Sequence, residues 1–498
     1  MISRSTTAVQ TSTGWVQGFT ADGYEHWRGI PYAAPPVGAR RFRAPVAAEP
    51  WEDVRPAIAY GPAPWPTPLH VSSRRVPRGG RGRVSEDCLT INIARRQSHA
   101  TQRPVIVYLY GGGNRTGASS LYPAARLVGE TDVIGVTFNF RIGVLGFLDL
   151  AGLQGGDRFD SNLALRDQIA ALRWIQENIA QFGGDPDNVT IYGESAGGLA
   201  VTTLLATPAA AGLFARAVSA SPPAFHVYAR DRARRWATEY LKVLGFEGAN
   251  VPAEIDRLPP RTLIAAAMTF DRRTRRQTTG TISVSYVVDG DLLPETPIEA
   301  FRGGRAHRVP ILIGTCRDEH ALFAKVVKGE LASNRVEIER LFASSAGGVL
   351  DRVVTAYSAD GRTDHSRIGG DAAFWYPSVA IAEAHSQYAP TRMYRVDHAP
   401  RTFKALGFGA THGSDVAMLF GTLDRIETML GATRSNDAFV RHLHADLAAF
   451  ARNGEPGPAW PPYDAVKRQT QVYGKDKYVV IDPEKNRRTA WEGFVGYP

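Results

Sequence analysis

The segment Val189–Gly198 constrains the fold most strongly, because it requires a strand, a sharp turn and the start of a helix within a few residues. Residues 189–192, Val-Thr-Ile-Tyr, favour a strand, and Leu199–Ala206 is apolar and typical of a helix. Between them, Gly193-Glu194-Ser195-Ala196-Gly197 has the Gly-x-Ser-x-Gly spacing of a nucleophile elbow. A side chain at either glycine would collide as the backbone doubles back. The pattern therefore predicts that Ser195 projects from the turn, at the positive end of a helix.

Alternating strand and helix signals predict an α/β fold. Val105–Tyr110 is a continuous apolar run, as expected for a strand buried on both faces of a parallel sheet, and Val133–Phe140 is a second. Residues 162–182 carry apolar side chains at helical spacing and are followed by Gly183-Gly184. Further elements are predicted downstream: strands at 309–315 and 392–396, and a terminal helix at 437–452. We therefore expect a large mixed, mostly parallel central sheet flanked by helices.

The chain is predicted to form one domain over residues 1–498, because no Pro- or Ser-rich linker and no repeat divides it. A small antiparallel hairpin is expected near the N-terminus, within about residues 8–30. Two stretches, about 224–305 and about 320–390, are mostly helical in character. We interpret them as cap-like insertions over the site, where substrate selectivity resides.

The composition is that of a soluble globular protein, with 44% hydrophobic and 21% charged residues in a chain of 498. The N-terminus lacks the apolar core of a secretory signal, and no stretch approaches the roughly 18 apolar residues of a membrane span. With two cysteines, Cys88 and Cys316, the chain has no disulfide framework. These features predict a cytoplasmic protein.

The formal net charge of +9 is concentrated in two arginine-rich stretches. The first holds Arg74, Arg75, Arg78, Arg81 and Arg83, and the second holds Arg272, Arg273, Arg275 and Arg276. Neither has interleaved aromatics or a nucleic-acid-binding module, so we interpret both as solvated surface loops and expect no nucleic-acid partner. The alternative is a basic rim that attracts anionic substrates toward a pocket.

A serine hydroxyl is a weak nucleophile near neutral pH, so Ser195 needs a base, and the base needs an orienting carboxylate. In this fold class the nucleophile, the acid and the histidine follow one another along the chain, each after a strand. Of the 12 histidines, His412 fits best, because it lies in a glycine-flanked loop after the strand at 392–396. His320 is the alternative base.

The candidate acids are Asp318 and Glu319, which both follow the strand at 309–315. Spacing alone does not choose between them. Glu194 is a third carboxylate, directly before the serine. We expect its side chain to point away from the histidine, and we interpret it as an electrostatic accessory that supports the imidazolium.

Three consecutive glycines, Gly111-Gly112-Gly113, follow the strand at 105–110. Their amides can face a ligand closely because no Cβ stands in the way. We therefore predict that Gly112 and Gly113 donate to an oxyanion. A flexible turn is the alternative interpretation.

Together these motifs resemble the type-B carboxylesterase/lipase family of α/β-hydrolases, which includes bacterial para-nitrobenzyl-type esterases and the cholinesterases. The resemblance spans nearly the whole chain, in segments that follow the family's order: 29–33, 35–38, 85–89, 111–113, 143–148, 182–186, 193–197, 318–319 and 412–413. It implies an α/β-hydrolase fold, with Ser195, Glu319 and His412 as catalytic residues and Gly112, Gly113 and Ala196 as oxyanion donors.

Three departures from the family's pattern are informative. Tyr110 stands before the glycines, where many members carry histidine, and in this respect the chain is similar to the cholinesterases. His320 replaces the usual glycine after the acid. The cysteine that would pair with Cys88 is absent, which leaves the loop at 65–87 untied. That loop also lacks the extra aromatics of a quaternary ammonium site, so a choline ester is not expected as substrate.

The resemblance implies a serine carboxylic-ester hydrolase that forms an acyl-enzyme on small to medium aryl or alkyl esters. Water is the second substrate, and no metal or organic cofactor is expected. Carbamates, amides or thioesters are alternative substrates, because the same machinery does not distinguish leaving groups. A non-catalytic adhesion or binding protein is a further alternative, although such relatives typically lose the serine. Phe225, His226 and Tyr228 are candidates to line the pocket, and ordinary packing is the simpler interpretation of each.

Overall fold

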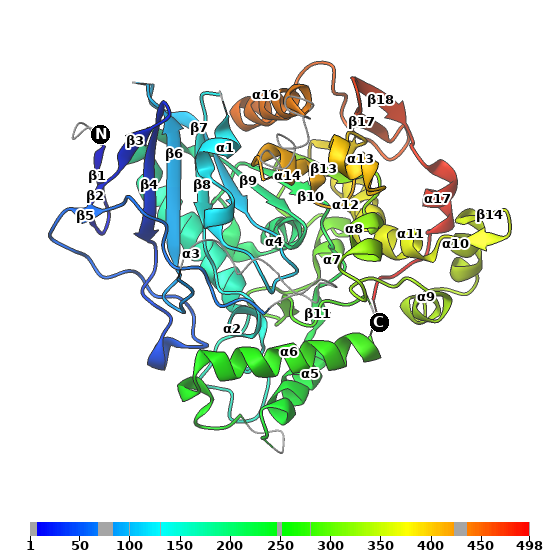
Figure 1. Ribbon diagram of the computed structural model, residues 1–498, viewed down its shortest axis with the longest axis horizontal. Helices are drawn as coiled ribbons and strands as arrows, with labels where there is room; N and C mark the ends of the chain where they lie inside the picture. The colour runs from blue at the N-terminus through cyan, green and yellow to red at the C-terminus, as the bar shows by residue number, and fades with distance from the viewer. Residues whose placement is uncertain are drawn as a thin grey trace.

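An eleven-stranded sheet forms the centre of the computed structural model, which describes residues 7–67, 83–98, 100–129, 131–246, 251–278, 280–422 and 436–497 (Figure 1). In spatial order its strands are β18 (Lys477–Ile481), β17 (Gln469–Tyr473), β16 (Thr391–Val396), β13 (Ile311–Cys316), β10 (Arg216–Ala220), β9 (Gly184–Glu194), β7 (Arg103–Leu109), β8 (Ile134–Phe138), β6 (Thr90–Arg96), β4 (Tyr24–Pro31) and β3 (Phe19–Ala21). Neighbouring strands from β17 to β8 are parallel. The pairs at both ends are antiparallel, so the sheet is mixed and mostly parallel, as predicted.

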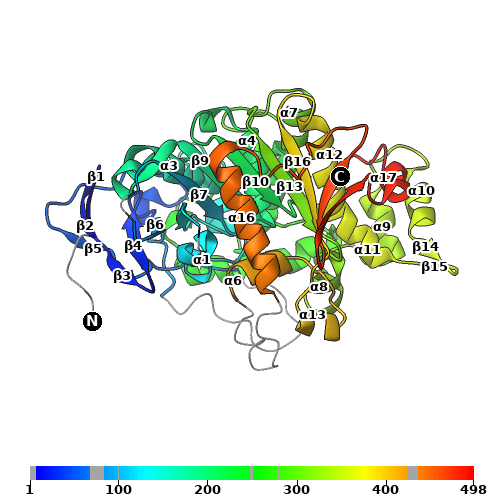
Figure 2. The same cartoon turned by 90° about the horizontal axis from the view of Figure 1, so that it is seen from above.

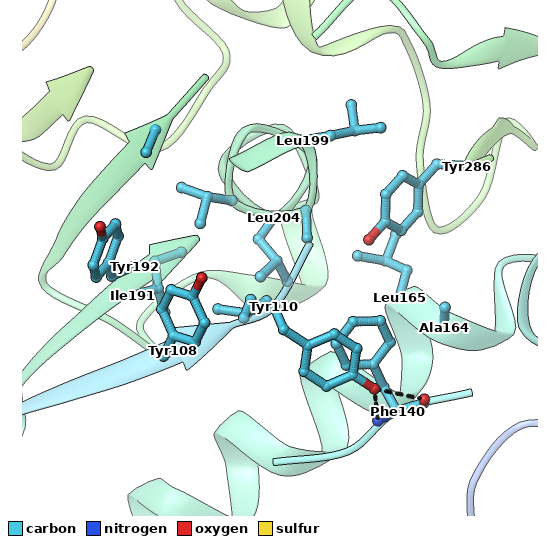
Figure 3. Close-up of a cluster of buried hydrophobic side chains, with 14 of the residues drawn as sticks. Tyr108, Tyr110, Phe140, Ala164, Leu165, Ile191, Tyr192, Leu199, Leu204 and Tyr286 are labelled. Carbon is cyan, nitrogen blue, oxygen red and sulfur yellow. Dashed lines mark hydrogen bonds between the residues drawn. The ribbon is translucent and has the colours of Figure 1, made fainter. Parts of the chain in front are cut away.

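The central strands are buried on both faces, which explains their continuous apolar sequences. Every residue of β7 and β8 is buried. Figure 3 shows Tyr108 and Ile191 of the sheet near Leu204 and Leu165 of the neighbouring helices. Tyr110, just beyond β7, stacks on Phe140 with ring centroids 4.5 Å apart and donates its hydroxyl to the Phe140 carbonyl at 3.3 Å. The buried central strands hold in place the edge of the sheet on which the site lies.

Helices cover both faces of the sheet (Figure 2). On one face lie α3 (Leu163–Asn178), α4 (Ala196–Leu205), α7 (Pro297–Arg302) and α12 (Tyr376–His385). On the other lie α1 (Ala124–Val128) and α16 (Asp437–Asn453). Shorter helices are α2 (Val144–Phe147), α13 (Arg401–Ala405), α14 (Ser414–Leu419) and α17 (Lys485–Ala490). The three-layer arrangement is that of an α/β-hydrolase.

The N-terminal segment forms two hairpins. One joins β1 (Ala8–Thr11) to β2 (Gly14–Gln17), which also pairs with β5 (Arg55–Pro56), and the other joins β3 to β4. The pairing of β1 with β2 agrees with the hairpin predicted for this segment. The second hairpin lies at the edge of the central sheet and adds β3 and β4 to it.

The two stretches interpreted as insertions are helical excursions between strands of the sheet. The first contains α5 (Arg230–Val243), α6 (Pro260–Gln277) and α7, with a short parallel pair of β11 (Tyr228–Ala229) and β12 (Val287–Val288). The second contains α8 (His320–Lys325), α9 (Arg335–Leu341), α10 (Val349–Ala356), α11 (His365–Gly370) and α12, with the small hairpin of β14 (Ser358–Ala359) and β15 (Arg362–Thr363). Between α11 and α12, Asp371–Trp375 forms a π-helical turn.

The second arginine stretch is helical and was wrongly interpreted as a loop, although three of its side chains, Arg272, Arg273 and Arg276, are exposed. Arg272, Arg273, Arg275 and Arg276 lie in the last turns of α6, where cations are favoured by the helix dipole. The side chain of Arg275 is only 10% exposed and pairs with Asp271 and Glu330. Of the first stretch, Arg83 is described, whereas Arg74, Arg75, Arg78 and Arg81 lie outside the described residues.

Candidate active site

Ser195 occupies a sharp turn between β9 and α4, with the backbone at φ 57° and ψ −125°. A positive φ is unusual for a residue other than glycine and marks a strained position. The neighbouring glycines make this turn possible. A Cβ added to Gly193 would stand 2.2 Å from the Gly197 carbonyl oxygen, and one added to Gly197 would stand 2.0 Å from the Leu109 carbonyl oxygen. The steric requirement predicted from the sequence is therefore present in the fold.

Three side chains from distant parts of the chain meet at this turn. His412 Nε2 lies 2.8 Å from Ser195 Oγ, and His412 Nδ1 lies 2.6 Å from Glu319 Oε2. Glu319 follows β13 at the start of α8, and His412 lies just before α14. Both are buried, with 1% of Glu319 and 8% of His412 exposed. This geometry gives His412 one nitrogen that accepts from the hydroxyl and one that donates to the carboxylate.

Of the two candidate acids, Glu319 contacts His412, and hydrogen bonds to its second carboxylate oxygen hold it there. Glu319 Oε1 accepts from the Ser221 hydroxyl at 2.6 Å and from the Cys316 amide at 2.7 Å, which leaves Oε2 facing His412. Asp318 instead accepts from the Arg317 side chain at 2.9 Å and the Ala410 amide at 3.1 Å. Ser221 was not identified from the sequence, because no motif marks it.

The expectation that Glu194 points away from the histidine was wrong. Its Oε1 lies 3.4 Å from His412 Nε2. Gly413 leaves room for this orientation, since a Cβ added there would stand 3.3 Å from Glu194 Oε1. The position of Glu194 directly before Ser195 in the sequence therefore did not predict the direction of its side chain.

Carboxylates surround His412 and set its protonation. Burial disfavours the imidazolium, but the charges of Glu194 and Glu319 outweigh burial and raise the pKa of His412 above its ordinary value. Burial raises the pKa of Glu194, and the nearby Asp415 and Glu319 add to the effect, while His412 opposes it. Asp415, on the first turn of α14, was not predicted as part of this cluster; burial raises its pKa to about 6. The charges around the site thus favour the protonated, positively charged form of His412.

Two aromatic rings flank the imidazole on the side of the second insertion. Phe374 stacks on His412, with ring centroids 4.2 Å apart and 28° between the planes, and Phe323 lies at 5.2 Å. Phe374 is presented by the π-helical turn Asp371–Trp375, a type of irregularity that is common at functional sites. The rings restrict the orientation of His412.

The segment Gly111–Thr116 faces the serine, and it is here called the oxyanion loop because Gly112 and Gly113 are expected from the sequence to donate to an oxyanion. A Cβ added to Gly111 would stand 2.8 Å from Ser195 Cβ, so the loop and the elbow pack backbone against backbone. Gly112 and Gly113 have φ values of 118° and 61°. Among the described residues, none accepts a hydrogen bond from the amides of Gly112, Gly113 or Ala196. These donors remain available to an anion beside Ser195.

A cavity of about 400 Å³ opens above Ser195 and His412. Its wall is mostly apolar and includes Leu121, Ile282, Leu322, Phe323, Val327, Leu331, Phe374 and Val416. Both insertions contribute to it. Of the three pocket candidates in the first insertion, His226 lines the cavity, whereas Phe225 packs against Tyr376 and Phe494, and Tyr228 packs against Trp236.

In the part of the chain that the structure describes, no cluster of His, Cys, Asp and Glu is arranged to hold a metal ion. None of the described helices is both long and apolar enough to cross a membrane.

Known proteins are similar to this chain in sequence and fold over almost its full length. A family model described as the carboxylesterase family matches residues 5–491. The chain is 36% identical over 491 residues to the para-nitrobenzyl esterase of Bacillus subtilis (strain 168), with 96% of this chain and 97% of that protein covered. It is 30% identical over 486 residues to the phenmedipham hydrolase of Pseudarthrobacter oxydans, with 94% and 95% covered. Among solved structures, a thermophilic PNB esterase matches with a TM-score of 0.86 at 34% identity, covering 98% of this chain and 100% of that chain.

Substitution of Gly193 by alanine should destabilise the fold, because the added methyl would overlap the Gly197 carbonyl. We expect the free energy of unfolding to fall by about 1–3 kcal/mol in Gly193→Ala, as measured by urea denaturation. Gly347→Ala is the matched control, since a Cβ there meets nothing within 4 Å. Equal stability of the two variants would contradict the steric account of the elbow.

Proposed function

Because the chain belongs to the carboxylesterase family and hydrolyses carboxylic esters, we propose that Ser195, His412 and Glu319 carry out the cleavage through an acyl-enzyme. One observation carries the proposal: the unbroken series of contacts from Ser195 Oγ through the imidazole to Glu319, at 2.8 Å and 2.6 Å. In it each group has the partner that its role requires.

The reaction begins when His412 Nε2 takes the proton of Ser195 Oγ and the oxygen attacks the ester carbonyl. The imidazolium donates through Nδ1 to Glu319, which stabilises its charge. His412 then gives the proton to the leaving alcohol, and the acyl group stays on Ser195. Water then repeats the sequence: His412 takes a proton from water as the water oxygen attacks the acyl carbonyl. The bond between the acyl carbon and Ser195 Oγ breaks, His412 returns the proton to Ser195 Oγ, and the carboxylic acid leaves.

The amides of Gly112, Gly113 and Ala196 stabilise the negative oxygen that forms at each tetrahedral stage. They are available as donors, and the last stands at the positive end of α4. Because the amides belong to rigid backbone, little reorganisation is needed when the charge develops.

The substrates proposed are small to medium aryl or alkyl esters. A cavity of about 400 Å³ with a mostly apolar wall suits an acyl or alcohol group of this size. The similarity to a para-nitrobenzyl esterase supports the same class. Selectivity among such esters would be set by insertion residues on the wall, including Ile282 and Phe374.

Ser195→Ala should lower the turnover of para-nitrophenyl acetate by at least about 10⁴-fold, because the nucleophile is removed while the fold is kept. The measurement is release of para-nitrophenolate, with circular dichroism to check the fold. Ser345→Ala is the control, since Ser345 lies outside the site between α9 and α10. Turnover by Ser195→Ala at the level of the control would refute the assignment of the nucleophile.

A series of para-nitrophenyl esters of increasing chain length, with a matched carbamate, anilide and thioester, should show the highest kcat/KM for short to medium acyl esters. The reason is the limited apolar volume beside Ser195. A higher kcat/KM for the carbamate or anilide than for every ester would contradict the proposed substrate class.

Glu194→Gln should move the acid limb of the kcat/KM profile to lower pH. His412 must be neutral to act as base, so activity is lost as the pH falls through its pKa. Glu194 raises that pKa, and a neutral amide would not. Glu295→Gln is the control, because Glu295 pairs with the exposed Arg305. An acid limb that stays in place, or moves upward, would show that Glu194 does not act on His412 in this way.

A further inference from the structure

Four charged side chains form a closed ring at the oxyanion loop, and two of them, Arg115 and Glu330, line the cavity. Arg115 donates to Asp271 and to Glu330, in both cases at 2.5 Å. Arg275 pairs with the same two carboxylates, at 2.9 Å from Asp271 and 2.6 Å from Glu330. The exposed fractions of the four side chains range from 3% to 10%. Two positive and two negative charges therefore balance one another largely out of water.

The ring connects three segments that are far apart in sequence. Arg115 belongs to the oxyanion loop, and Asp271 and Arg275 lie one turn apart on α6, in the first insertion. Glu330 lies between α8 and α9, in the second insertion. The Ser283 hydroxyl also donates to Asp271, at 2.7 Å. Both insertions are thus fastened to the loop that faces the serine.

The oxyanion loop depends on such anchors. Gly112, Gly113 and Asn114 all have positive φ, and the amides of both glycines have no acceptor in the described part of the chain. Their direction is therefore set by other contacts of the loop. The Arg115 amide donates to the Gly112 carbonyl at 3.1 Å. The Arg115 guanidinium lies against Gly113, where an added Cβ would stand 3.5 Å from Nη2.

We propose that Arg115 is a positioning residue for ester hydrolysis: held by Asp271 and Glu330, it keeps the Gly112 and Gly113 amides aimed at the developing oxyanion. This inference rests on the proposed function, in which those amides stabilise the tetrahedral stages. Donors act only when aimed at that position, and a misplacement of about 1 Å can cost roughly 100-fold in rate. The ring's charges cancel, so its role is geometrical rather than attraction of an ionic substrate.

A positioning role for Arg115 predicts a specific change in kcat and KM. The ground-state ester gains little from the oxyanion amides, whereas the transition state depends on them. Loss of the ring should therefore lower kcat and leave KM nearly unchanged. A wall residue that contacts the substrate directly would instead change KM.

The test compares Arg115→Lys and Glu330→Gln with the unaltered protein. Lysine keeps the charge but lacks the fork that bridges two carboxylates, and glutamine keeps the shape of Glu330 without its charge. The substrate is para-nitrophenyl acetate, and the inhibitor is a trifluoromethyl ketone, whose carbon bonds to Ser195 and whose oxygen becomes the anion in the hole. We expect kcat to fall about tenfold or more with KM within about twofold, and the Ki of the ketone to rise by the factor that kcat/KM loses.

Arg41→Lys is the matched control. Arg41 also forms a buried bidentate pair, with Glu86, and bonds the carbonyls of Asp256 and Leu258 in the first insertion, but it contacts no part of the oxyanion loop. It should lower Tm while kcat and Ki stay the same. If Arg115→Lys does not fold, Glu330→Gln decides the question.

Two outcomes would overturn the positioning role: folded variants with unaltered kcat and Ki, or a rise in KM alone. Ser195→Ala distinguishes this failure from failure of the proposed function. If Ser195→Ala is inactive while Glu330→Gln equals the unaltered protein, the nucleophile stands and the role of Arg115 falls. If Ser195→Ala keeps its turnover, the proposed function itself is wrong.

Discussion

The close approach of three backbone segments around Ser195 is the constraint on which the rest of the site depends. Gly193 and Gly197 let the elbow fold on itself and against the end of β7, and Gly111 lets the oxyanion loop rest on it. No side chain fits between these segments. The distance between the elbow and the start of the oxyanion loop at Gly111 is thus set by packed backbone.

Opposite electrostatic demands are met on opposite sides of the serine. Uncommitted amides and the positive end of α4 lie on one side, where the proposed mechanism forms an oxyanion, while carboxylates surround the imidazole of His412 on the other. The two sides have different supports. Glu319 is held by Ser221 and the Cys316 amide close to the sheet, whereas the oxyanion loop is tied to the insertions through Arg115.

Sequence reasoning succeeded where local sterics or burial decide the structure. The elbow and the central strands followed from glycine spacing and continuous apolar runs. The choice between Asp318 and Glu319 could not be made from spacing, since it depends on donors that arrive from elsewhere in the fold. The burial of Arg275 was not predicted, because one of the two carboxylates that it pairs with, Glu330, is 55 residues away in the sequence. The strand β18, mostly exposed, carries no alternation that marks it as part of the sheet.

The contacts of His412 with Ser195 and Glu319 join residues that are 217 and 93 positions apart, so the site is assembled late in synthesis. A nascent chain that has emerged only as far as the second insertion already contains Ser195 but lacks His412. Under the proposed mechanism, such a chain cannot activate the serine, even if its central strands have paired. Under the proposed mechanism, the topology thereby keeps Ser195 inactive during synthesis until β16 and the loop that follows it have been added.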